Sequence, residues 1–267
     1  MGKVSNMPYT SVADQFQDQF QLLLATESEL KTEVYRVRYQ VYCQELQYEP
    51  AENFPNQQEQ DEYDDRSVHC LLRHRQSGRY AGCVRLILAQ PPDQMDFPFE
   101  RVCHTLYPSE IDLGEEARPF LGEISRLAVT EQFRKRPGEQ TSAVGVSDHS
   151  ESEPSGRRQF PLIAVSLYLA VSAIVIEGKL EKACTMMEPR LARHLRFFGI
   201  NCRPVGEVVN YHGRRGPFTI TPQEFLNGLD PRFRSLFEYI QSEIRGPLTG
   251  YLPKVLSERA EISEMST

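Results

Sequence analysis

The stretch that most restricts the fold of this chain is FPLIAVSLYLAVSAIVIEG, residues 160–178. A membrane-spanning helix needs roughly 18 or more apolar residues in succession. Here Ser166, Tyr168 and Ser172 interrupt the apolar run, and the charged Glu177 follows it. We therefore interpret the stretch as a helix that is buried on most sides. Such a helix requires a sheet and further helices to cover it.

Strand patterns that can supply this sheet occur on both sides of the buried helix. Residues 67–90 contain two alternating runs joined at Gln76–Gly78, which predicts a β-hairpin. Residues 120–129 (FLGEISRLAV) and 182–187 (KACTMM) each predict one strand, and residues 202–221 predict a last hairpin that turns near Gly213–Gly216.

Two further helices are expected. Residues 11–48 have apolar positions at helical spacing without Gly or Pro, and Pro189 and Gly199 bracket a basic helix. Helices and strands therefore mix, and the expected fold class is α/β with a mostly antiparallel sheet flanked by helices. We expect one domain over residues 1–253, a disordered insertion at 137–158 that is rich in Gly, Ser, Pro and Glu, and a polar tail at 254–267.

Composition excludes several functional classes. The net charge of −7 disfavours nucleic-acid binding, which needs a basic face. The amino terminus has no apolar segment of the kind found in a signal peptide, and we expect no membrane span. The six cysteines are scattered without metal-binding spacing, so we expect buried thiols, no metal site and a cytoplasmic location.

Three groups of charged residues occur in unusual places. Residues 59–65 (EQDEYDD) form an acidic run, which alone predicts a solvated loop. Arg85 lies in an apolar strand pattern, where a charge needs an acidic partner. Glu123 and Arg126 share the strand at 120–129, and an ideal strand would point them to opposite faces. They can serve one site only if the strand is bulged or strongly twisted between them; otherwise Glu123 forms a structural ion pair and Arg126 faces solvent.

In this order, the blocks VRYQVYCQELQY, EQDEYDD, GCVRLIL and GEISRLAV resemble the autoinducer (N-acyl-homoserine lactone) synthase family of GNAT-like acyltransferases. The resemblance covers about residues 30–130, and MEPRLARHLRFFGI resembles the last strand and helix of a GNAT domain. The chain departs from that family in having no Trp, a longer segment between Tyr48 and Glu59, and the insertion at 137–158. The pattern, including MEPRLARHL, is more similar to the acyltransferases associated with bacterial PEP-CTERM/exosortase systems, and it is also similar to long-chain N-acyl amino acid synthases.

The resemblance implies a GNAT-like fold and a set of site residues. The implied catalytic residues are Glu123, Arg126 and Asp64. The implied substrate-binding residues are Arg38, Tyr42, Tyr48, Glu59, Asp61, Arg85 and Ser125. The implied donor-binding residues are Val129, Arg134, Lys135 and Arg136.

The implied activity is transfer of a fatty acyl group, expected to be long, from acyl carrier protein or acyl-CoA to a small amine such as an amino acid. Glu123 would take the proton of the amine, and backbone N–H groups near Leu127–Val129 would stabilise the oxyanion. The GNAT pyrophosphate loop is poorly matched by FRKRPGEQ, which favours acyl carrier protein as donor and partner. No tightly bound cofactor is expected. Two alternatives stay open: a homoserine lactone synthase that uses S-adenosylmethionine, and a non-catalytic module that binds an acyl carrier or effector.

Overall fold

The computed structural model describes residues 11–90, 95–134 and 162–251. In these residues, one sheet has the strand order β1-β2-β3-β4-β5-β8-β6, and β7 pairs with β8. The pairing of β4 with β5 is parallel, and the other pairings are antiparallel. The strands are β1 (Phe20–Leu24), β2 (Ser67–His74), β3 (Tyr80–Leu88), β4 (Leu121–Val129), β5 (Lys182–Met187), β6 (Arg203–Pro204), β7 (Val209–Asn210) and β8 (Arg214–Ile220).

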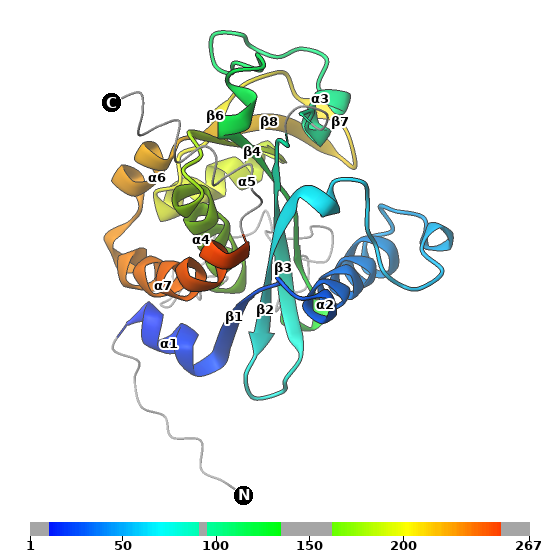
Figure 1. The fold of residues 1–267 in the computed structure, drawn as a ribbon, viewed down its shortest axis with the longest axis vertical. Helices are drawn as coiled ribbons and strands as arrows, with labels where there is room; N and C mark the ends of the chain where they lie inside the picture. Colours follow the sequence, from blue (N-terminus) through cyan, green and yellow to red (C-terminus); the bar gives the residue numbers. More distant parts are fainter. Residues whose placement is uncertain (1–10, 91–94, 135–161, 252–267) are drawn as a thin grey trace, which may run out of the picture.

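Helices lie on both faces of the sheet (Figure 1). Helix α2 packs on one face, against β2, β3 and β4, and α4 packs on the other face with α7 beside it. A π-helix, Tyr39–Glu45, continues α2. The α-helices are α1 (Val12–Gln19), α2 (Ser28–Arg38), α3 (Pro98–Val102), α4 (Leu162–Glu177), α5 (Pro189–Leu195), α6 (Pro222–Gly228) and α7 (Arg234–Tyr251).

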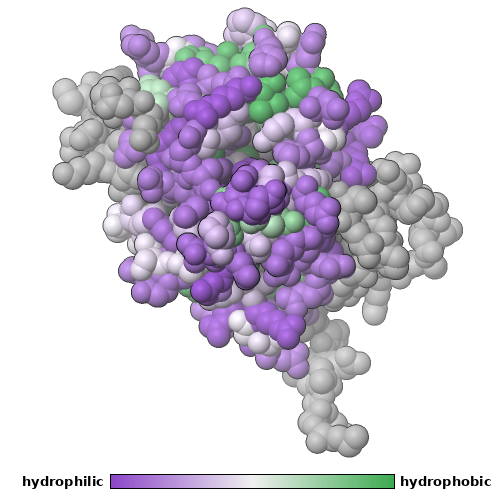
Figure 2. Space-filling view, turned by 90° about the vertical axis from the view of Figure 1, so that its right-hand side faces the viewer, coloured by the Kyte–Doolittle hydropathy of each residue, from purple (hydrophilic) through white to green (hydrophobic). Residues whose placement is uncertain are grey.

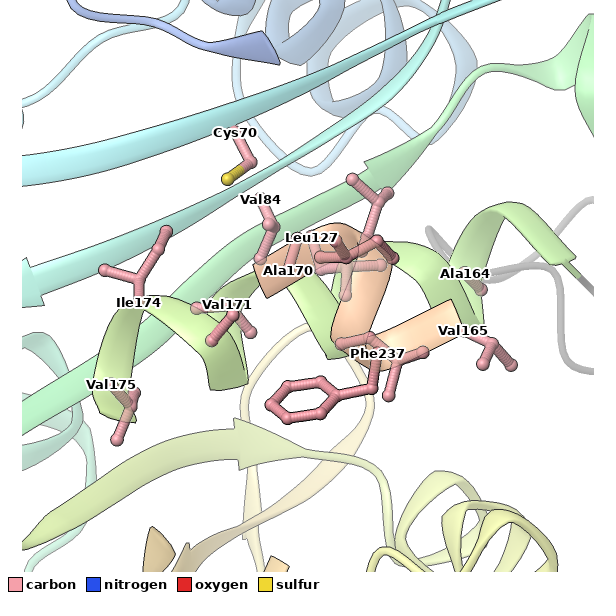
Figure 3. Close-up of a cluster of buried hydrophobic side chains, with 14 of the residues drawn as sticks. Cys70, Val84, Leu127, Ala164, Val165, Ala170, Val171, Ile174, Val175 and Phe237 are labelled. Carbon is pink, nitrogen blue, oxygen red and sulfur yellow. The ribbon is translucent and has the colours of Figure 1, made fainter. Parts of the chain in front are cut away.

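The main hydrophobic core lies between the sheet and α4. Figure 3 shows Val171 and Ile174 of α4 near Val84 and Leu127 of the sheet and Phe237 of α7. Full burial of an aliphatic or aromatic side chain contributes roughly 1.5–3 kcal/mol. The sheet covers one side of α4 and α7 covers another. The helix can therefore be apolar around most of its circumference, as its sequence predicts.

The face of the sheet under α2 carries two smaller apolar clusters. One lies beneath α2 and the π-helix and contains Val34, Val41 and Ala128. The other lies near α3 and contains Phe97 and Phe99. The outer surface on this side of the molecule is mainly hydrophilic, with hydrophobic residues gathered near its top (Figure 2). Polar side chains are therefore available to build a site on this face.

Most of the predicted elements are confirmed. The hairpin corresponds to β2 and β3, the central strand to β4, the buried helix to α4, and residues 182–187 to β5. Gly199 ends the helical turns that begin at Pro189, with a left-handed φ of 79°. The last hairpin turns at 211–213, close to the predicted position. The mostly antiparallel α/β sheet is also confirmed.

The prediction of one helix over residues 11–48 is wrong at Phe20–Leu24. These residues form β1, which pairs with β2 and buries Phe20, Leu22 and Leu24 in the main core. An edge strand of five residues with three adjacent leucines satisfies helical and strand periodicity equally well. Pairing with β2, which no local pattern specifies, decides between them.

All six cysteines are free and buried, as predicted. No helix in the described residues is long and apolar enough to cross a membrane. The predicted insertion at 137–158 and the predicted tail at 254–267 lie outside the described residues.

Candidate active site

The centre of the site is a β-bulge in β4. Cys83 of β3 pairs with Ala128, whereas Arg85 pairs with Ser125, so Arg126 and Leu127 together lie opposite a single residue. Arg126 has a φ of 51°, in the left-handed region that non-glycine residues seldom adopt. The extra residue shifts the alternation of side chains along the strand. Arg126 therefore lies on the same face as Ser125 and Glu123, and Leu127 enters the main core.

This bulge resolves the conflict between Glu123 and Arg126 that the sequence presents. Both side chains lie on the α2 face of the sheet, as a shared site requires. They nevertheless have different partners. Arg126 joins a network of acids, whereas Glu123 accepts a hydrogen bond from the backbone N–H of Phe99 at 3.0 Å. No ion pair within 4 Å joins the two residues.

The acidic run at 59–65 is folded onto three arginines rather than into solvent. Arg38 pairs with Glu59 and, at 2.5 Å, with Asp64. Arg85 donates to Asp61 at 2.6 Å and to Asp64 at 2.8 Å. Arg126 lies 3.1 Å from Glu59, 3.5 Å from Asp61 and 3.4 Å from Glu49. We call these seven residues the ion network: Arg38, Arg85, Arg126, Glu49, Glu59, Asp61 and Asp64.

Mutual attraction keeps the ion network charged although much of it is buried. Burial alone would raise the pKa of Glu59, but the charges of Arg38 and Arg126 outweigh it and lower this pKa to about 2. In the same way, Arg38 and Arg85 hold the pKa of Asp64 well below its ordinary value. Paired acids therefore hold Arg38 and Arg85 in place at neutral pH. The interpretation of the acidic run as a solvated loop is wrong for Glu59 and Asp64, whose exposed fractions are 1% and 4%.

Tyr42 connects the π-helix to the bulge. Its hydroxyl donates to the carbonyl of Leu127 at 2.9 Å, and the guanidinium of Arg126 lies 5.4 Å from the centre of its ring. Tyr48 lies next to it, with 6.3 Å between ring centres. Short π-helical segments often occur at functional sites. Here the π-helix places the ring of Tyr42 against the bulged part of β4.

A cleft of about 570 Å³, open to solvent, begins where β4 and β5 separate. The parallel pairing runs from Leu121 and Lys182 to Ile124 and Thr185. Beyond Ile124, the bulge forms one wall of the cleft and the end of β5 forms the other. The cleft is lined by Tyr42, Ile124, Ser125, Arg126, Leu127, Tyr168, Thr185, Met186, Met187, Glu188, Leu191 and Arg215.

A second, mainly apolar cavity, which is small and partly open to solvent, lies on the α4 side of the same strands. Ser172, Val175 and Ile176 of α4 line it together with Ile220 and Phe225. Ile124 lines both this cavity and the cleft. The two spaces therefore share one lining side chain, that of Ile124 in β4.

Glu123 lies beside the cleft without lining it. Its neighbours across the sheet are Ile87 and Cys184, and its exposed fraction is 2%. Burial raises the pKa of its carboxyl to about 8, against the hydrogen bond from Phe99 and the charge of Arg85, which lower it. This carboxyl can take up or release a proton near neutral pH. It needs an intervening group to exchange that proton with the cleft.

The structure brings together some predicted site residues and separates others. Tyr42, Ser125 and Arg126 line the cleft. The other acids and arginines of the ion network pair with one another next to them and do not line the cleft. The side chain of Arg134 is buried and paired with Glu45, and that of Val129 packs in the main core. Lys135 and Arg136 lie outside the described residues. In the described part of the chain, no three His, Cys, Asp or Glu side chains gather in a way that could hold a metal ion.

Sequence reasoning missed Glu188 and Arg215. Glu188 directly follows β5, and a charged residue at the carboxyl end of a central strand is a recognisable signal. Arg215 stands in the run HGRRGP, and nothing local distinguishes it from Arg214. Only the pairing of β8 with β5 places Arg215 at the cleft.

Comparisons with known proteins agree with this architecture. Residues 37–143 match the family described as acetyltransferase (GNAT) domain. No curated protein matches the chain. Three solved structures share the fold at low sequence identity: TofI in a complex with an inhibitor and MTA, BjaI with SAM and isopentyl-CoA, and FeeM.

TofI is 20% identical, with a TM-score of 0.53 over 80% of this chain and 98% of TofI. BjaI, a CoA-dependent acyl-homoserine lactone synthase, is 16% identical, with a TM-score of 0.50 over 84% of this chain and 89% of BjaI. FeeM, an N-acyl amino acid synthase from uncultured soil microbes, is 12% identical, with a TM-score of 0.50 over 79% of this chain and 94% of FeeM. The fold of this chain is therefore GNAT-like.

Proposed function

We propose that this GNAT-like chain is an N-acyltransferase that moves a fatty acyl group from a thioester to a small amine such as an amino acid. The observation that carries the proposal is the bulge in β4 beside the cleft that opens between β4 and β5. A bulge turns backbone groups away from the strand ladder. Backbone N–H groups near Leu127–Val129 are thus proposed to meet the oxygen of a thioester carbonyl.

The reaction needs no covalent enzyme intermediate. The amine nitrogen attacks the thioester carbon, the C–S bond breaks, and the thiolate leaves and takes up a proton. Burial raises the pKa of the six cysteine thiols, so none has the lowered pKa of a nucleophilic cysteine.

We assign the proton of the attacking amine to Glu123. The best general base has a pKa near the working pH, and the pKa of Glu123 is about 8. Because Glu123 does not line the cleft, water beside Ser125 is proposed to carry the proton between them. Arg126 and Asp64 are proposed to set the shape of the acceptor side through the ion network, together with Arg38, Glu59, Asp61 and Arg85.

The donor is proposed to be acyl carrier protein or acyl-CoA, bound as a co-substrate. Among the structural neighbours, BjaI is a CoA-dependent synthase and FeeM is an N-acyl amino acid synthase. Lys135 and Arg136 remain candidates for contact with an acidic carrier protein. The side chain of Arg134 is already paired with Glu45, so it is proposed to anchor the end of β4 instead. A link to a PEP-CTERM system stays a prediction from sequence.

The acyl chain is proposed to pass Ile124 and enter the apolar cavity beside α4. Replacing Ser172 by Phe fills that cavity and should shift the products to shorter acyl chains. Replacing Ile176 by Ala enlarges it and should shift them to longer chains. Mass spectrometry of the acyl amides measures both shifts, and identical chain-length profiles in all three proteins would contradict this path.

The proposed function is tested by mass spectrometry of lipid extracts from cells that express the chain. We expect a new acyl amide, which identifies the acceptor and the acyl length together. Cells that express the Thr185→Trp variant, whose side chain fills the cleft, provide the matched control and should lack the product. An acyl-homoserine lactone in the extract would instead establish the lactone-synthase alternative.

A negative result needs a second arm, because the host can lack a substrate. Purified protein is therefore supplied with acyl-CoA and acyl carrier protein thioesters and a mixture of amines. If no amide forms from either donor, the N-acyltransferase proposal fails. The non-catalytic binding module then becomes the better account of the fold.

A further inference from the structure

Two arginines line the cleft, and their surroundings differ. The guanidinium of Arg126 lies within 3.5 Å of three acids: Glu49, Glu59 and Asp61. Its charge is therefore compensated within the protein. Behind it, Arg85 is also occupied, by Asp61 and Asp64. Neither Arg126 nor Arg85 has its charge left over for a substrate anion.

Arg215 is the uncompensated cation of the cleft. It lies near the start of β8, next to Gly216, which pairs with Met187 at the end of β5. Among the described residues, its side chain forms no ion pair and no hydrogen bond, and its buried Nε has no partner. A buried donor without a partner costs stability. A ligand acceptor in the cleft would remove this cost.

The ring of Tyr48 packs against Arg215 without consuming its hydrogen-bonding groups. Its guanidinium lies 5.5 Å from the centre of the Tyr48 ring. Another neighbour of this ring is His212, stacked at 4.9 Å with an angle of 22° between the planes. A guanidinium that stacks on a ring can still use its edge to bind a carboxylate with two parallel hydrogen bonds.

The position of Arg215 favours the acceptor over the donor. Tyr48 adjoins Tyr42, whose ring contacts Arg126 on the α2 face of the sheet. This face is polar, whereas the cavity past Ile124 on the α4 side is apolar and suits an acyl chain. An anion at Arg215 thus belongs to the molecule that occupies the polar side. Glu188 also lines this cleft, but its carboxylate is paired with Arg190.

We propose that Arg215 binds a carboxylate of the acceptor, so that the preferred acceptor is an amine that also carries a carboxylate. This inference rests on the proposed acyl transfer, and it makes Arg215 the specificity-determining residue of that site. Arg126, which is held by acids, then shapes the cleft without binding the carboxylate.

The test compares acceptors that differ only in the carboxylate. Each α-amino acid of a panel is paired with the amine obtained by its decarboxylation, and amide formation is measured with purified full-length protein. The wild type should prefer the amino acid about 10-fold or more. Arg215→Gln should raise the KM for the amino acid roughly 10-fold to 100-fold, with a much smaller change in kcat, and should remove most of the preference for the amino acid over the plain amine. Arg215→Lys, which keeps the charge but loses the planar fork, should restore part of the affinity.

Arg214→Gln is the matched control, because Arg214 is the exposed neighbour on the same strand and does not line the cleft. It should behave as the wild type. An equal response of both variants, or no preference for the amino acid, would overturn the inference while leaving acyl transfer intact. A rise in the KM for the acyl donor alone would assign Arg215 to a phosphate of the donor and would also overturn it.

A binding measurement keeps the inference testable if no amide forms. The thermal unfolding midpoint is then recorded with and without millimolar amino acids or plain amines. Stabilisation of the wild type by amino acids alone, lost in Arg215→Gln and kept in Arg214→Gln, would support carboxylate recognition although acyl transfer had failed. No stabilisation would overturn both proposals.

Discussion

Glu123→Gln should lower the turnover of the purified enzyme about 100-fold or more and leave its fold intact. General-base catalysis contributes roughly 10²–10⁴ in rate, and an amide cannot accept the proton of the amine. The amide oxygen can still accept the hydrogen bond from Phe99, so the packing around it is kept. Single-turnover acyl transfer, with circular dichroism as a check on folding, measures the effect. Glu115→Gln, at an exposed loop position, serves as the control.

The same variant should change the pH dependence of stability. In the unfolded chain the carboxyl of Glu123 loses its proton near the ordinary glutamate pKa of 4.5, whereas in the folded protein its pKa is about 8. Between these values the folded state binds more protons, so the free energy of unfolding decreases as pH rises. Urea unfolding from pH 5 to 9 should show this decrease in the wild type and less of it in Glu123→Gln. Unchanged turnover with a flattened profile would make Glu123 a structural residue and would favour the binding-module alternative.

Arg38→Met should destabilise the protein by about 3–5 kcal/mol, because it leaves buried acids without their partner. Arg38 has an exposed fraction of 0%, and it pairs with Glu59 and Asp64, which are nearly as buried. Met is shorter than Arg but retains the packing of its aliphatic stem. The free energy of unfolding in urea at pH 7 measures the loss.

Arg36→Met on the same helix is the matched control. The side chain of Arg36 is 55% exposed and pairs with Glu33 at the surface, so its loss should change stability by less than about 0.5 kcal/mol. The effect of Arg38→Met should also shrink at acid pH, where Glu59 and Asp64 become protonated. A loss of less than about 1 kcal/mol at pH 7 would show that the ion network does not hold this part of the fold.

The parts of the fold that follow from local sequence patterns were predictable. The alternation in β2, β3 and β4, the apolar length of α4, and the Pro and Gly that bracket α5 each identify an element without its partners. β1 and α7 show the limit. Helix α7, which buries Leu236, Phe237, Ile240 and Ile244 at helical spacing, was not predicted.

The site was predictable to the extent that charges in apolar surroundings demand partners. Arg85 and the acids of residues 59–65 meet for that reason, and Arg126 could join Glu123 on one face only through a bulge. The separation of Glu123 from the ion network was not predictable, because Phe99, which binds it, comes from a short helix in a distant part of the chain. Arg215 was not predicted as a site residue for a similar reason: its position depends on which strand β8 pairs with.

The parallel pairing of β4 with β5 also affects how the protein folds. It joins Leu121 to Lys182, about 60 positions apart, whereas the hairpin of β2 and β3 closes over a short turn. Contacts between residues far apart in the chain have a larger entropy cost of loop closure, and they slow folding. The ion network uses only residues that precede β5, so it can assemble on the early hairpin and β4. One wall of the cleft comes from β4 and the other from β5. Because these two strands are far apart in the chain, we expect the cleft to be the last part of the molecule to form.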